Sequence, residues 1–123
     1  MRLLLDTHVL IWWDEGAKIS AKAGQAIREA EQVYVSAASA WEIAIKASLG
    51  RLSTARCVAD ASAESGFEEL PVRVAHAEAV QALPWHHQDP FDRMLVAQAL
   101  VEGLTVVTRD PVFRPYGVRT LKA

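Results

Sequence analysis

The chain has 123 residues, of which 51% are hydrophobic and 23% charged, and its formal net charge at pH 7 is −2. That length predicts one domain over residues 1–123, and the composition excludes a disordered chain. The charge excludes a chain that is basic throughout, so affinity for nucleic acid requires local clusters of Lys and Arg. The single cysteine, Cys57, excludes an internal disulfide and a zinc–cysteine cluster, which favours a reducing, cytoplasmic location.

The N-terminal segment joins an apolar strand to an acidic residue. Residues 3–5 are three leucines, a run typical of a strand buried on both faces of a parallel sheet. Asp6 follows where that strand should end, and we expect it to form the floor of an acidic pocket. Asp6 and His8 also interrupt the apolar run, which argues against a signal peptide. No run approaches the roughly 18–20 apolar residues that span a membrane.

Short strands and helices alternate along the rest of the chain. The predicted strands cover residues 2–6, 33–36, 67–70, 104–107 and 118–121, and the predicted helices cover residues 7–14, 21–31, 37–49, 55–65, 74–83 and 89–102. Ser20 is the candidate N-cap of the second helix, and Ser36 or Ser39 of the third. Ser53 or Thr54 is the candidate for the fourth. The alternation predicts an α/β domain with a mainly parallel sheet.

Three aspartates follow or begin these elements, and each has a structural explanation and a chemical one. Asp6 and Asp110 lie at strand-to-helix junctions, and Asp92 lies in a first helical turn, where aspartate suits capping and the helix dipole. Ligands of parallel sheets bind at the carboxyl ends of the strands, so Asp6 and Asp110 meet if their strands are neighbours. Clustered carboxylates repel one another unless a cation such as Mg²⁺ or Mn²⁺ neutralises them. Asp89 is either the helix cap or an outer ligand.

Glu42 is the fourth acid of interest. It lies four residues before Lys46 on a predicted helix, and a surface ion pair at this spacing contributes only a few tenths of a kcal/mol. However, Ala38, Ile45 and Leu49 flank Glu42 on the same side of the helix, so its carboxylate should be poorly solvated. The second observation favours a functional role.

Four short motifs surround these acids: Leu4-Leu5-Asp6-Thr7-His8, Ser39-Ala40-Trp41-Glu42-Ile43, Asp89-Pro90-Phe91-Asp92-Arg93 and Val107-Thr108-Arg109-Asp110. In order, spacing and context, they resemble the PIN-domain family and, within it, the VapC-type toxins of bacterial toxin–antitoxin pairs. The resemblance covers nearly the whole chain and implies a parallel sheet with helices on both sides. It further implies that four acids are catalytic and bind Mg²⁺ or Mn²⁺, with two supporting threonines. The acids are Asp6, Glu42, Asp92 and Asp110, and the threonines are Thr7 and Thr108.

The same resemblance implies an activity and partners. The activity is that of an endoribonuclease directed at single strands, in which metal-activated water attacks the phosphodiester. The partners are RNA, a small VapB-type antitoxin and a second copy in a homodimer. Trp12, Trp13 and Trp41 supply apolar surface for such contacts or for a packed core. Candidate RNA contacts are Arg93, Arg109 and Lys46, together with Arg51 and Arg114, although arginine beside the acids also balances their charge.

Other functions compete with this interpretation. A phosphorylatable receiver domain requires an acidic pair after the first strand, whereas Asp6 is followed by Thr7. A metal-free ribonuclease requires a base for the ribose 2′-hydroxyl, which His86-His87 would supply only with a partner. A catalytically inactive PIN-like RNA-binding module and a metal-dependent phosphatase keep the same fold, and only assays separate them from the nuclease.

Overall fold

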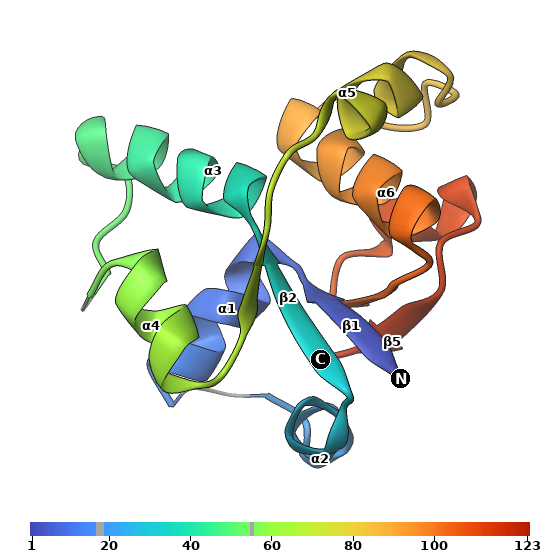
Figure 1. Ribbon diagram of the computed structural model, residues 1–123. Helices are drawn as coiled ribbons and strands as arrows, with labels where there is room; N and C mark the ends of the chain where they lie inside the picture. The colour runs from blue at the N-terminus through green and yellow to red at the C-terminus, as the bar shows by residue number, and fades with distance from the viewer. Residues whose placement is uncertain (17–18, 55) are drawn as a thin grey trace.

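The computed structural model describes residues 1–16, 19–54 and 56–123 of the chain (Figure 1). Its centre is a five-stranded sheet in the order β3-β2-β1-β4-β5, in which every neighbouring pair is parallel. The strands are β1 (Arg2–Leu5), β2 (Gln32–Ser36), β3 (Glu68–Leu70), β4 (Thr105–Thr108) and β5 (Thr120–Lys122). The predicted parallel α/β fold is confirmed, and β1 and β4 are neighbours.

Helices cover both faces of this sheet, with α1 and α4 on one side and α5 and α6 on the other (Figure 1). The helical segments are α1 (Thr7–Asp14), α2 (Ala21–Glu29), α3 (Ala37–Ser48), α4 (Val58–Glu64), α5 (Val74–Gln81), α6 (Pro90–Glu102) and the 3₁₀ helix η1 (Pro111–Tyr116). Among these described helices, none combines the length and the apolar character that a membrane span requires.

The three leucines of β1 supply both halves of the core. Leu4 packs with residues of α6 and η1, such as Leu95 and Phe113. Leu3 and Leu5 point to the opposite face, where they join residues of α1, α2 and β2. Successive side chains of a strand alternate between the faces of a sheet, so a run of three apolar residues fits a strand covered on both sides. This burial fixes β1 at the centre, and therefore fixes where Asp6 leaves the sheet.

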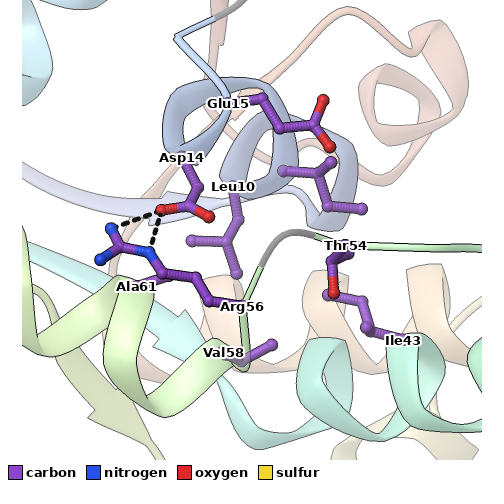
Figure 2. Close-up of a pocket in the computed structure, with 9 residues that line it drawn as sticks. Leu10, Asp14, Glu15, Ile43, Thr54, Arg56, Val58 and Ala61 are labelled. Carbon is purple, nitrogen blue, oxygen red and sulfur yellow. Dashed lines mark hydrogen bonds and ion pairs between the residues drawn. The ribbon is translucent and has the colours of Figure 1, made fainter.

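The start of α4 differs from the prediction. We expected a helix from residue 55 with Ser53 or Thr54 as its cap; residue 55 lies outside the described residues, and the helix begins at Val58 after Cys57. Arg56 lies before the helix, and its Nε and Nη2 donate to Asp14 Oδ1 at 2.8 and 2.6 Å. Figure 2 shows this contact beside a small pocket between α1 and α4. The ion pair joins the two helices on one face of the sheet.

Candidate active site

Asp6 and Thr108 meet where two central strands end. Leu5 of β1 is paired with Val107 of β4, and Asp6 N donates to the Val107 carbonyl at 3.0 Å, which continues the pairing beyond Leu5. The Thr108 hydroxyl donates to Asp6 Oδ2 at 2.7 Å and accepts a hydrogen bond from Asp110 N at 2.9 Å. Thr108 thus orients the Asp6 carboxylate and fixes the backbone of Asp110.

The Asp6 side chain does not cap the helix that follows it. Asp6 occupies the N-cap position of α1, but its carboxylate makes no capping hydrogen bond and only 6% of the residue is exposed. Burial is the main cause that raises the pKa of Asp6; the charge of Asp110 also raises it, while the Thr108 hydrogen bond lowers it. The purely structural explanation of Asp6 therefore fails, because the carboxylate is buried at an energetic cost without satisfying the helix.

Glu42 reaches the same end of the sheet from α3. The helix begins at Ala37, where the Ser36 hydroxyl at the end of β2 accepts a hydrogen bond from Ala38 N at 3.0 Å. Glu42 is 5% exposed, and its Oε1 accepts a hydrogen bond from the Thr7 hydroxyl at 2.9 Å. Lys46 donates to Glu42 Oε2 at 2.7 Å, so the expected ion pair is present, although the acid is buried. Thr7 supports Glu42 as Thr108 supports Asp6.

Asp92 is held by the loop before α6. Asp89 is the helix cap, since its Oδ1 accepts hydrogen bonds from Phe91 N at 2.8 Å and Asp92 N at 3.1 Å. The Asp92 side chain is therefore not needed to cap the helix. His87 Nε2 lies 2.9 Å from Asp92 Oδ2. Burial raises the pKa of Asp92 to about 6, and the charges of Asp89 and Asp6 contribute, while the His87 contact lowers it. Asp92 and Asp6 therefore lie within electrostatic reach of each other.

Asp110 is the most solvated of the four predicted acids. It is exposed, and its Oδ1 accepts from Val112 N at 3.1 Å as the cap of η1. Its charge nevertheless contributes to the raised pKa of Asp6. Within the described ranges, no three of the four predicted acids place oxygens within 4.8 Å of one another. The four acids therefore lie in one region at the edge of the sheet, but their oxygens do not form a compact metal-binding cluster.

The structure corrects the expectation that Arg93 contacts RNA. Arg93 is 3% exposed, and its guanidinium donates to the carbonyls of Pro84 at 2.9 Å and Val80 at 3.2 Å. It also donates to the Tyr116 hydroxyl at 3.2 Å. The carbonyls lie in and just beyond the last turn of α5, where the helix dipole favours a cation. Arg93 therefore holds the segment between α5 and α6 in place from inside the protein.

The other two basic candidates are more exposed. Arg109 is exposed; its Nε donates to the Ala123 carbonyl at 3.0 Å, and its guanidinium lies 4.2 Å from the centre of the Trp12 ring. Lys46 has 40% of its side chain exposed. Its pKa is raised, first by the hydrogen bond to Glu42 and further by the charges of Asp89 and Asp92. Lys46 is thus a cation at the rim of the acidic site.

A sequence comparison matches residues 3–118 to the family described as the PIN domain. The chain belongs to the PIN-domain family. Ribonuclease VapC22 of Mycobacterium tuberculosis is 31% identical over 118 residues, which cover 93% of this chain and 91% of the relative. The resemblance to VapC-type proteins predicted from the four motifs is confirmed.

Solved structures of toxin–antitoxin complexes share the fold. DNA-bound VapBC from Salmonella typhimurium superposes with a TM-score of 0.72 at 20% identity, covering 98% of this chain and 97% of that chain. VapBC2 from Rickettsia felis, bound to a fragment of its promoter, gives 0.71 at 12% identity and covers 98% of both chains. At such identities the likeness shows the fold alone.

The raised pKa of Asp92 predicts that the metal-free protein loses stability as pH rises. The pKa of Asp92 is about 6 in the folded protein, whereas the ordinary pKa of an aspartate is 3.8, so protonation favours the folded state. The free energy of unfolding should fall between about pH 4 and pH 7, by at most about 3 kcal/mol from this residue. In urea titrations with chelator, Asp92→Asn should flatten that slope and be the more stable protein at pH 7.5. The exposed-site variant Asp60→Asn should follow the wild type, and an unchanged slope in Asp92→Asn would contradict the assignment.

Proposed function

We propose that this protein is a metal-dependent endoribonuclease and the toxin of a VapBC-type pair. The observation that carries the proposal is the Asp6 carboxylate, which is buried at the end of the central strand and does not cap its helix. Such a group has a chemical use rather than a structural one. Its counterpart at this edge, Asp92, has a raised pKa, and the relative VapC22 is named a ribonuclease.

The residues fit a hard divalent cation. Burial disfavours the ionised forms of Asp6 and Asp92, and an ion that prefers oxygen ligands would stabilise those forms. Asp6 and Asp92 would hold Mg²⁺ or Mn²⁺, with Glu42 and Asp110 completing the set. When bound, such an ion makes water more acidic and neutralises charge on phosphate oxygens. Thr108 and Thr7 keep two of the carboxylates oriented through their hydroxyl hydrogen bonds.

The rim of the site suits a single strand of RNA. Lys46 on α3 is partly exposed, and Arg109, which follows β4, is exposed. They would bind phosphates while Asp6 and Asp92 act on the scissile one. Because water rather than the ribose 2′-hydroxyl attacks, the products should carry a 5′-phosphate and a 3′-hydroxyl.

Two kinds of protein partner accompany this proposal, and both would act in the cytoplasm. The structural neighbours come from toxin–antitoxin complexes, which supports a VapB-type antitoxin for this chain. An apolar groove of about 590 Å³ lies between α3, α5 and α6, and it supports a homodimer or antitoxin contact. Trp41, on its wall, is 64% exposed.

Removing the metal tests the activity. Purified protein incubated with single-stranded RNA should lose cleavage in excess chelator and regain it when Mg²⁺ or Mn²⁺ is added back. Mapping of the fragment ends should give 5′-phosphates. Cleavage that persists in chelator and leaves 2′,3′-cyclic phosphates would contradict the proposal and support a metal-free mechanism. RNA binding without cleavage would indicate the inactive module, and hydrolysis of a nitrophenyl ester but not RNA would indicate the phosphatase.

A further inference from the structure

The loop before α6 brings an imidazole and two carboxylates together. The donor atoms of His87, Asp89 and Asp92 all lie within 4.8 Å of one another, and each residue is half-buried. The shortest separation, 2.9 Å, is the hydrogen bond between His87 Nε2 and Asp92 Oδ2, whose proton a bound metal ion would replace. Adjacent ligands of an octahedral ion are about 3 Å apart when each lies about 2.1 Å from the metal. Two of the three donors therefore already have the spacing of neighbouring ligands.

The backbone holds these three residues in fixed places. Asp89 uses Oδ1 to cap α6, so that its carboxylate is oriented by two backbone N–H groups while Oδ2 takes no part in the cap. The His87 carbonyl accepts long hydrogen bonds from Arg93 Nη1 at 3.5 Å and from the Tyr116 hydroxyl at 3.4 Å. Ligands whose supports are fixed in this way bind an ion with less loss of conformational freedom.

We propose that His87, Asp89 and Asp92 form a site for a first-row transition-metal ion such as Mn²⁺, with His87 as its nitrogen ligand. Mg²⁺ is a hard ion that favours an all-oxygen set, whereas imidazole suits transition metals and carboxylates suit Mn²⁺ as well. One nitrogen and two carboxylates therefore discriminate in favour of Mn²⁺. An imidazole that binds a metal ion does so in its uncharged form, so the two carboxylates alone match the charge of the ion.

The site extends the acidic set at one of its members. Asp92 belongs both to the proposed catalytic acids and to this cluster, so an ion held by His87 would lie beside the place where the phosphate is expected. The catalytic meaning of His87 rests on the proposed nuclease function, but the binding itself does not. Lys46 is the nearby cation, since the charges of Asp89 and Asp92 both raise its pKa, and a bound ion would compete with it.

Metal titrations of the full-length, RNA-free protein test the proposal. Binding of Mn²⁺ would be followed by the loss of its free electron paramagnetic resonance signal at pH 7.5, and binding of Mg²⁺ by calorimetry. Wild type should prefer Mn²⁺, and His87→Gln should lose at least about tenfold in Mn²⁺ affinity with little change for Mg²⁺. His86→Gln is the matched control, since His86 is exposed and packs edge-on against Tyr116.

A second variant distinguishes the loss of a metal ligand from unfolding of the loop before α6. Asp89→Ser keeps a capping hydroxyl but removes the carboxylate, so it should retain the fold and lose Mn²⁺ affinity. Equal Mn²⁺ affinities for wild type and His87→Gln, with both folded, would overturn the site. RNA cleavage is scored separately: Mn²⁺ binding that depends on His87 in a protein that cleaves no RNA would support this site and reject the nuclease function.

Discussion

Asp6→Asn is expected to lower RNA cleavage by at least about a thousandfold, because the lost ligand removes several kcal/mol of charge stabilisation in the transition state. The fold should persist, since asparagine still offers an oxygen to the Thr108 hydroxyl that now donates to Asp6 at 2.7 Å. It should even gain stability, because the substitution removes a carboxylate whose pKa is raised by burial. Initial cleavage rates in saturating Mg²⁺, with thermal unfolding in parallel, measure both effects.

The matched control is Asp60→Asn, which makes the same chemical change at an exposed position in the first turn of α4. It should cleave RNA at the wild-type rate. In cells, induction of the wild type and Asp60→Asn should arrest growth, and Asp6→Asn should not. Full cleavage by Asp6→Asn would reject the metal mechanism, and growth arrest that survives the loss of cleavage would reject the nuclease as the cause of toxicity.

Arg93→Met should destabilise the protein by about 3 kcal/mol, although methionine fills much of the same space. The guanidinium now donates to the carbonyls of Val80 and Pro84 and to the Tyr116 hydroxyl. Without it, these buried acceptors lose their donor near the end of α5, and each unsatisfied group costs roughly 1–3 kcal/mol. Urea unfolding would give the free energy, and hydrogen exchange over residues 82–89 should become faster.

Two further variants test whether the loss of stability comes from the hydrogen bonds of the planar Arg93 guanidinium. Arg93→Lys keeps the charge but has a single ammonium in place of a planar fork, so it should fall between wild type and Arg93→Met. Arg114→Met removes an arginine from an exposed position in η1 and should change stability by less than about 0.5 kcal/mol. Equal stabilities for Arg93→Met and Arg114→Met would show that Arg93 does not hold this segment.

The sequence was sufficient for the elements whose signals are local. The three leucines of β1, the Ser20 and Ser36 caps and the alternation of strands and helices predicted the sheet and most boundaries. The sequence left open whether the strands before Asp6 and Asp110 are neighbours, and the pairing of β1 with β4 shows that they are. The start of α4 was missed: the helix begins at Val58, and Arg56 just before it contacts Asp14, 42 residues earlier.

In the site, too, the features missed from the sequence depend on contacts between residues that only the folded chain brings together. Arg93 was expected to contact phosphate because it adjoins Asp92 in the sequence. It lies on the buried face of α6 with Val96 and Ala97, which follow it by three and four residues. That helical spacing could have predicted the burial of Arg93. His87 was considered only as a base for a metal-free ribonuclease, and its contact with Asp92 depends on how the loop folds back. Trp85, in the same loop, is 77% exposed and lies over the Arg93 guanidinium.

The pairing of β1 with β4 has a consequence for protein synthesis. Asp6 leaves the ribosome before Thr108, but the hydroxyl that orients it belongs to Thr108, which lies 102 positions later. Contacts so distant along the chain form late, because the intervening loop must close first. A nascent chain that has not yet released β4 therefore carries all the residues of the first two acidic motifs without an assembled acidic site. The order of translation therefore delays assembly of the acidic site until β4 has been synthesised and released.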